Sequence, residues 1–63
     1  MRKNELLAII VKNGLTQKEV AKKLNMSPKT FYNKMHKGVF GTDEVSAMVD
    51  FLHIENPADI FFG

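Results

Sequence analysis

The spacing of apolar residues predicts a chain of short helices that end at turn residues. Near the start, Leu6, Ile9 and Ile10 share one face of a helix, and Asn13-Gly14 is a typical stop. Towards the other end, four apolar residues spaced by three and four positions predict a further helix. These residues are Val45, Met48, Val49 and Leu52. No segment alternates apolar and polar residues over a useful length, so the pattern does not favour strands.

Capping residues indicate where the helices in the middle of the chain begin. Thr16 and Glu19 have the spacing of a capping box, in which a hydroxyl and a carboxylate each accept a backbone N–H. Ser27-Pro28 combines a capping hydroxyl with a proline at the first helical position, where no N–H is needed. Gly38 is expected to end the helix that begins there. The middle of the chain is therefore predicted to hold two helices joined by a short turn.

Similar signals predict two more helices in the remaining chain. Thr42 is expected to cap a fourth helix, whose first turn would carry Asp43 and Glu44 at the positive end of the helix dipole. Asn56-Pro57 repeats the combination of a cap and a proline and opens a fifth, short helix. Five short helices with short loops are typical of an all-α bundle. We therefore predict a single all-α domain over residues 1–63.

The two middle helices have the most specific geometry. A turn as short as Asn25-Met26 makes two helices cross steeply, which is the arrangement of a helix-turn-helix at about residues 16–37. Four apolar side chains are expected to fill the angle between the two helices. They are Val20, Leu24, Phe31 and Met35. The third helix, residues 27–37, then keeps its opposite face free to enter a DNA major groove.

Length and composition exclude several classes of protein. A chain of 63 residues is too short for a two-domain enzyme. Because it has no cysteine, it cannot hold a disulfide framework, a thiolate zinc site or an iron–sulfur cluster. The longest apolar run, Leu6 to Val11, is six residues long and too short to span a membrane. The first residues lack the pattern of a secretion signal, so a cytoplasmic protein is expected.

Charge is divided unevenly along the chain. Residues 1–37 hold all nine Lys and Arg and only two acidic residues, a net charge of +7. Residues 38–63 hold five acidic residues and no Lys or Arg, a net charge of −5. A basic half of this kind attracts polyanions, of which the phosphate backbone of a nucleic acid is the commonest. The alternative is an uneven distribution of charge on an ordinary solvated surface.

A further set of residues extends along nearly the whole chain. It consists of Gly14-Leu15-Thr16-Gln17, Val20-Ala21, Leu24, the helix from Ser27 to Met35, Gly38 and Pro57-Ala58-Asp59-Ile60-Phe61. This set resembles the phage repressor and Cro-like family, also called XRE-type helix-turn-helix regulators. The resemblance implies a lambda-repressor-like domain of five helices and a Cro-like regulator of transcription, such as a phage or prophage repressor. It also implies that the partner is double-stranded operator DNA, usually bound by a symmetric dimer.

The resemblance also assigns roles to individual residues. It implies base contacts in the major groove from Pro28, Lys29, Tyr32 and Asn33. It implies phosphate contacts from Gln17, Thr30, Lys34, His36, Lys37, Arg2 and Lys3. The chemistry agrees with these roles, because a lysine donates to guanine O6 and N7 and an asparagine pairs with adenine N6 and N7. The alternative for each residue is simple exposure to solvent.

The chain carries more apolar surface than so small a body readily buries. Three aromatic residues in the acidic half are candidates for an exposed patch. They are Phe51, Phe61 and Phe62. We expect a homodimer through this half, which would place two recognition helices about 34 Å apart, one turn of DNA. The alternative is that these rings complete the core.

Catalytic and metal chemistry have little support in the sequence. His36 and His53 are seventeen residues apart and have no thiol or clustered carboxylate beside them, unlike the ligands of a metal site. Ser27 and Ser46 have no His and Asp arranged around them, and no glycine-rich loop follows a strand. We therefore expect no enzyme, no metal, no cofactor and no small-molecule substrate.

Two functions other than operator binding stay open. One is a protein-interaction module of the antirepressor kind, which would dock on another regulator through the acidic, aromatic C-terminal half. The other is an RNA-binding or nonspecific nucleic-acid-binding protein, which would use the basic half without reading bases.

Overall fold

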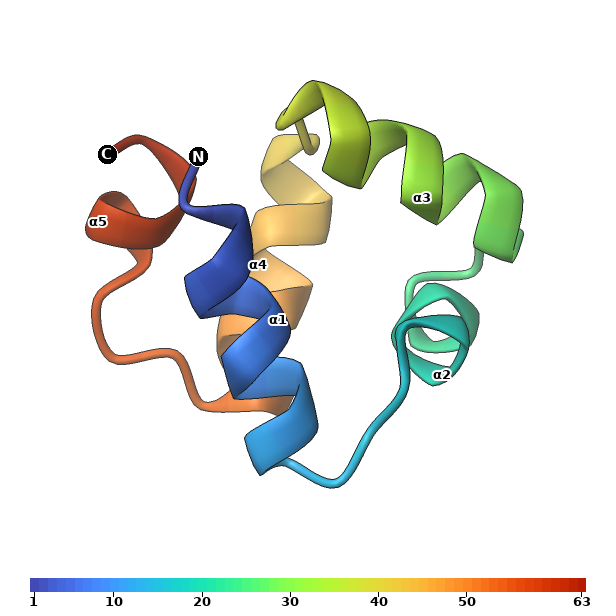
Figure 1. Cartoon of the computed structure of the whole chain (residues 1–63), viewed down its shortest axis with the longest axis horizontal. Coiled ribbons are helices and arrows are strands. Elements are labelled where there is room, and N and C mark those ends of the chain that lie inside the picture. The colour runs from blue at the N-terminus through green and yellow to red at the C-terminus, as the bar shows by residue number, and fades with distance from the viewer.

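The computed structural model describes all 63 residues, and its regular structure consists of five α-helices without a strand (Figure 1). The helices are α1 (Lys3–Lys12), α2 (Gln17–Lys23), α3 (Pro28–Lys37), α4 (Thr42–Leu52) and α5 (Pro57–Phe61). This confirms the prediction of an all-α fold with five short helices. None of these helices has the length and apolar character needed to cross a membrane.

The helices pack around one apolar core. α3 packs on α2, while α5 packs on both α1 and α4 (Figure 1). The two ends of the chain meet beside α5, where the backbone N–H of Arg2 donates to the carbonyl of Ile60 at 2.7 Å. As a result, α2 and the start of α3 lie on the opposite side of the molecule from the chain ends (Figure 1).

The core consists of eleven buried residues, all of them apolar. They are Leu6, Ile10, Val20, Ala21, Phe31, Met35, Met48, Leu52, Ile54, Ile60 and Phe61. Each helix contributes two of them from its apolar stripe, so every helix is anchored by burial of one face. Of the residues expected to fill the angle between α2 and α3, three lie in this core and Leu24 packs against it, half-buried.

The predicted caps of α2 and α3 are confirmed. The hydroxyl of Thr16 accepts the backbone N–H of Glu19 at 3.2 Å, and the Glu19 carboxylate accepts the N–H of Thr16 at 3.0 Å. Ser27 accepts the backbone N–H of Thr30 at 3.2 Å. Gly38 ends α3 in the left-handed conformation with φ 74°. These bonds satisfy backbone groups that have no partner inside the helix.

The expected cap of α4 is wrong by one residue. Thr42 is the first helical residue, and Gly41 is the N-cap. The carboxylate of Glu44 accepts the backbone N–H of Gly41 at 2.7 Å, so the acidic residue three positions after the cap fixes where α4 begins. Asn56 stands at the N-cap of α5 as expected, but its side chain makes no capping hydrogen bond.

Two residues other than glycine have positive φ. Asn25, in the turn after α2, has φ 57°, which agrees with its expected place in a tight turn. His53, the C-cap of α4, has φ 55° and was not predicted to adopt this conformation. The left-handed His53 redirects the chain from α4 into the loop that leads to α5.

Candidate nucleic-acid interface

The turn between α2 and α3 brings the two helices into close contact. The backbone N–H of Met26 donates to the carbonyl of Ala21 at 3.0 Å, which folds the turn back onto the end of α2. Ala21 is fully buried, and its small side chain lets the neighbouring helix approach closely. The steep crossing expected of a helix-turn-helix therefore rests on a small residue and a left-handed asparagine.

α3 has one buried face and one exposed face. Phe31 and Met35 lie in the core, at 0% and 7% exposed. Lys29, Tyr32 and Asn33 are exposed, as is His36 one turn further along, and these positions form a stripe along the outer side of the helix. Three of the four residues expected to contact bases therefore share one exposed face. Pro28, the fourth, is half-buried at the first helical position.

The start of α3 is held by a small hydrogen-bonded group. Besides accepting from the Thr30 backbone, the Ser27 hydroxyl donates to the Thr30 hydroxyl at 2.9 Å. Thr30 is therefore part of the cap, although its side chain remains exposed. Gln17 is half-buried at the first position of α2, where backbone N–H groups without helical partners are found.

Lys34 points away from the exposed stripe and contacts α4. Its Nζ donates to Glu44 Oε2 at 2.5 Å, and the two side chains are 35% and 20% exposed. The hydrogen bond from Lys34, followed by that from the Gly41 backbone, lowers the pKa of Glu44 below its ordinary value. The ion pair was not foreseen, because it joins residues ten positions apart on different helices.

The N-terminal cations also have partners within the molecule. The guanidinium of Arg2 forms an exposed ion pair with Glu5 at 3.0 Å. Lys3 donates from Nζ to the carbonyl of His36 at 2.5 Å, which places a positive charge at the negative end of the α3 dipole. Both side chains remain exposed, and Lys3 lies beside the end of α3.

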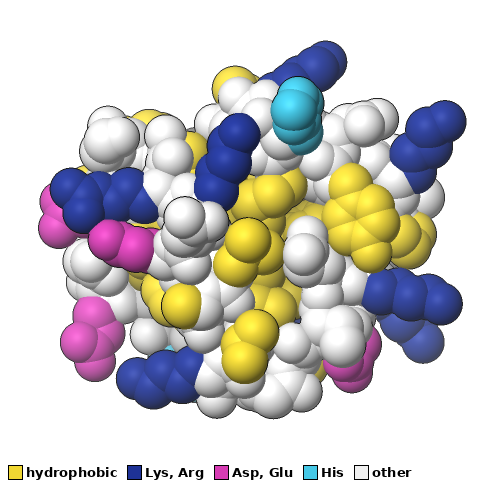
Figure 2. Space-filling view, viewed as in Figure 1, with side chains coloured by type: hydrophobic (Ala, Val, Ile, Leu, Met, Phe, Trp, Pro, Cys, Tyr) yellow, Lys and Arg dark blue, Asp and Glu magenta, His cyan; other side chains and the backbone are white.

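The surface of α2 and α3 is strongly basic. The segment Gln17–Lys37 contains six lysines and one glutamate. Figure 2 shows several Lys and Arg side chains projecting from the side of the molecule where these helices lie. α3 itself contains no acidic residue. A polyanion that approaches this side therefore meets cations and the polar groups of Tyr32 and Asn33.

Two helices that cross over a short turn, with a basic outer face on the second, define a helix-turn-helix DNA-binding domain. The family model described as "Bacterial regulatory protein, Fis family" matches residues 3–38, more than half of the chain. The chain therefore belongs to the Fis family of bacterial regulatory proteins, a family of DNA-binding domains and not of enzymes. No curated protein and no solved structure matches the chain.

The match corrects the resemblance to the phage repressor and Cro-like family, and with it the lambda-repressor-like assignment of the fold. The Thr16 cap, the Val20-Ala21 pair and the Gly38 stop carried that resemblance. Any helix-turn-helix needs residues of these kinds to cap its helices and let them cross closely. They identify the motif, and they do not separate one helix-turn-helix family from another.

The boundaries of the match coincide with structural boundaries. It begins at Lys3, the first residue of α1, and ends at Gly38, the residue that ends α3. α4 and α5 lie outside the match. The first three helices therefore place the chain in the family. The match does not include the acidic part of the chain.

The three aromatic residues proposed for a dimer interface have different surroundings. Phe61 is 7% exposed and packs in the core against Phe40, with ring centroids 6.5 Å apart, so this ring follows the alternative that it completes the core of the single chain. Phe51 is half-buried, and the ammonium of Lys23 lies 5.7 Å from its ring. Only Phe62, at 78% exposed, offers a free ring.

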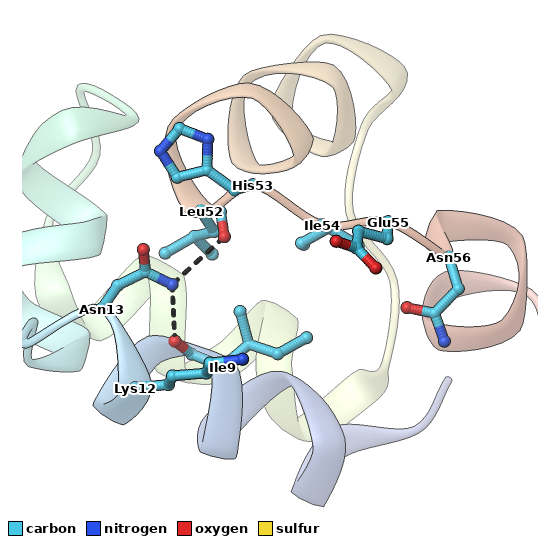
Figure 3. A pocket seen from close by; sticks show the side chains of 8 residues that line it. All are labelled: Ile9, Lys12, Asn13, Leu52, His53, Ile54, Glu55 and Asn56. Atoms are coloured by element: carbon cyan, nitrogen blue, oxygen red, sulfur yellow. Dashed lines mark hydrogen bonds between the residues drawn. The ribbon is translucent and has the colours of Figure 1, made fainter.

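A hollow lies between the end of α1 and the segment that leads from the end of α4 to α5 (Figure 3). Its main polar contact is Asn13, whose Nδ2 donates to the carbonyls of Ile9 at 2.8 Å and Leu52 at 3.1 Å. These bonds join the end of α1 to the end of α4, a structural role that the sequence did not indicate. His53 borders the hollow, and no group of three or more metal-ligating side chains forms there or elsewhere.

Proposed function

We propose that the protein is a sequence-specific regulator of transcription that binds double-stranded DNA with α3 in the major groove. The observation that carries the proposal is the division of α3 into two faces. Phe31 and Met35 fix the helix to the core, and the side chains of Lys29, Tyr32 and Asn33 project from the opposite face. A helix held in this way presents its outer residues to base edges without losing contact with the body.

The exposed stripe has suitable chemistry for reading bases. Lys29 donates to guanine O6 and N7, and Asn33 donates and accepts with adenine N7 and N6. Tyr32 contacts a thymine methyl group or a phosphate. Pro28 supplies an apolar surface at the start of the helix, which suits contact with a thymine methyl group.

The residues around this stripe are proposed to hold the phosphate backbone. Gln17 offers its side chain and the N-terminus of α2 to one phosphate. His36, at the end of the stripe, and Thr30 and Lys37, which are exposed beside it, are proposed to contact phosphates. The exposed side chains of Arg2 and Lys3 are proposed to extend this set, and Lys3 contacts the end of α3 through the carbonyl of His36.

The regulator is proposed to act as a homodimer in the cytoplasm. Phe62 supplies exposed apolar area at the chain end remote from α2. A twofold axis through this region would place two α3 helices about 34 Å apart, on one face of a palindromic site.

Selection of random duplex DNA against the purified protein at about 150 mM salt tests the proposal, because this salt concentration screens weak phosphate binding. Recovery of a palindromic motif with half-sites one helical turn apart is expected. Failure of a folded protein to enrich any motif would overturn sequence-specific binding. Enrichment of any duplex alike, with binding lost steeply as salt rises, would instead indicate nonspecific binding to nucleic acid.

One observation favours a second function, docking on another protein. α4 and α5 lie outside the family match, and the segment 38–63 that contains them holds five acidic residues and no Lys or Arg. Phe62 adds an exposed aromatic ring to this acidic surface. If no DNA motif is enriched, a basic, apolar surface on another regulator becomes the expected partner, and substitution of Phe62 is expected to abolish the contact.

A further inference from the structure

We propose that Lys34 and Glu44 form a clamp that sets the orientation of α3, and that Lys34 is a positioning residue and not a phosphate contact. This inference rests on the proposed function, because it concerns how α3 is aimed at DNA. It replaces the role that the resemblance to another family implied for Lys34. It also gives Glu44, a residue of the helix outside the family match, a part in DNA recognition.

Glu44 is a fixed acceptor. Its Oε1 accepts the backbone N–H of Gly41 at 2.7 Å, and its Oε2 accepts from Lys34 Nζ at 2.5 Å. It stands at the third position of α4, where the positive end of the helix dipole favours a negative charge. Both oxygens are therefore engaged, and the side chain is held in one position before any DNA arrives.

Lys34 differs from the other lysines of α2 and α3. Of the six lysines in α2 and α3, it alone forms an ion pair, and its side chain is only 35% exposed. Lys29 and Lys37 are exposed and have no acidic partner. Lys29 and Lys37 are therefore available to neutralise a phosphate, while Lys34 is already neutralised within the molecule.

If Lys34 exchanged Glu44 for a DNA phosphate, its ammonium would gain no net electrostatic stabilisation. The ammonium would give up one anion for another, and the carboxylate would be left unpaired close to the negatively charged backbone. Glu44 remains ionised at neutral pH, since its pKa is lowered by the hydrogen bonds that it accepts. The number of counterions that DNA releases on binding therefore does not include one for Lys34.

The clamp lies at the end of α3 where other contacts converge. Phe31 packs against Phe40 in the connection to α4, with ring centroids 5.5 Å apart. Lys3 holds the carbonyl of His36 from the other side. With these contacts, the ion pair limits rotation of α3 about its own axis, and such rotation would move Lys29 and Asn33 away from the bases that they read.

The two possible roles of Lys34 predict different results in DNA binding. Loss of a phosphate contact flattens the dependence of log K on log salt by about 0.9 and weakens binding to every sequence alike. Loss of a positioning contact leaves that slope unchanged and reduces the ratio of motif to random-DNA affinity. Lys37→Ala is the matched control, because it removes a lysine of the same helix that has no ion pair.

The experiment measures binding of the selected motif and of random duplex over a series of salt concentrations. Lys34→Ala and Glu44→Gln are both expected to lower the affinity ratio up to about fivefold, and the double variant is expected to lower it no further. Neither the slope of Lys34→Ala nor that of Lys34→Arg is expected to change, and Lys34→Arg is expected to restore the ratio because it keeps the ion pair. Glu44→Gln keeps the bond to Gly41 and therefore the start of α4.

Three results would overturn the inference. A slope that flattens by about 0.9 in Lys34→Ala, as in Lys37→Ala, would make Lys34 a phosphate contact. An unchanged affinity ratio in Glu44→Gln would show that the clamp does not aim α3. Absence of any motif for the wild-type protein would overturn the proposed function itself, and the clamp with it. Circular dichroism of each variant separates loss of folding from loss of positioning.

Discussion

Neighbouring residues of α3 serve different purposes because a helix turns by about 100° at each step. Phe31 is fully buried, and the next two residues, Tyr32 and Asn33, are exposed. The rings of Tyr32 and Phe31 meet edge-on, with centroids 6.3 Å apart, so the aromatic ring of Tyr32 is supported although the residue is 47% exposed. Support of this kind reduces the freedom of an exposed side chain before it meets a base.

Base contacts and phosphate contacts are expected to respond differently to substitution. Lys29→Ala and Asn33→Ala should each lose about 1–3 kcal/mol of discrimination between the selected motif and a site changed at one position. Lys37→Ala should weaken binding to both sites equally. Titration of each variant against a set of single-base changes measures the two effects.

Lys12→Ala is the control for these variants, because Lys12 is an exposed lysine on α1 beside the hollow of Figure 3. It should leave both affinity and discrimination close to their wild-type values. If Lys29 and Asn33 behave like Lys37, the assignment of base readout to the exposed stripe is wrong.

At the scale of the helices, the sequence predicted the caps and ends that depend on neighbouring residues alone. The Thr16 capping box, the Ser27-Pro28 start and the Gly38 stop each depend on residues within one turn, and the structure confirms all three. The start of α4 was misplaced because Thr42 is a good capping residue, yet the spacing Gly41-x-x-Glu44 was also present and determined the cap.

Contacts between residues far apart in the chain could not be predicted from the sequence in this way. Phe61 and Phe62 are adjacent and have the same chemistry, but only Phe61 meets Phe40 in the core. The pairing of Lys34 with Glu44 likewise depends on how α3 and α4 pack. The exposed stripe of α3 was predictable because helical periodicity alone assigns its face, whereas the family was not, because every helix-turn-helix shares the same local requirements.

The capping box of α2 supplies a test at this scale. Thr16→Ala removes the hydroxyl that accepts the Glu19 N–H, and it should cost about 1 kcal/mol of unfolding free energy. Thr42→Ala is the matched control, since Thr42 lies inside α4 and caps nothing. Urea denaturation of the two variants should show a lower midpoint for Thr16→Ala alone. Equal midpoints would contradict the importance of this cap.

The ion pair between α3 and α4 should make part of the stability depend on pH. The pKa of Glu44 is lowered in the folded state, so its contribution is complete at neutral pH and is lost as the pH falls through the folded-state pKa, which lies below the ordinary value of a glutamate. Glu44→Gln should therefore be less stable than the wild type by up to about 1 kcal/mol at pH 7, a value limited by the partial exposure of the pair.

The difference between the two proteins should close as the pH falls through the folded-state pKa of Glu44, where the wild-type carboxyl becomes protonated, and thermal melts at pH 7 and along a series of falling pH measure it. Asp43→Asn is the control, because it removes a charge from the same turn of α4 without breaking an ion pair. A difference between wild type and Glu44→Gln that persists unchanged to the acid end of that series would show that the ionised carboxylate is not its source.

At the scale of the whole molecule, the family match ends close to the point where the chain changes from basic to acidic. The matched helices α1 to α3 hold nearly all of the positive charge, and the helices outside the match hold most of the negative charge. The lysines of α2 and α3 favour an approach to DNA through these two helices. In the proposed complex, the helices outside the match do not enter the groove and could meet a second protein molecule while DNA is bound.

The proposed dimer is the last property to test at this scale. Phe62→Ser should leave the melting temperature almost unchanged, because the ring is 78% exposed in the single chain, but it should remove the apolar area available to a partner. Sedimentation of the wild-type protein over a range of concentrations should show a monomer–dimer equilibrium that the variant lacks. On DNA, the variant should bind an isolated half-site like the wild type and lose the extra affinity for two half-sites spaced by one helical turn. A wild-type protein that stays monomeric to high micromolar concentration and binds paired half-sites no better than Phe62→Ser would contradict the dimer, while leaving the reading of each half-site by α3 intact.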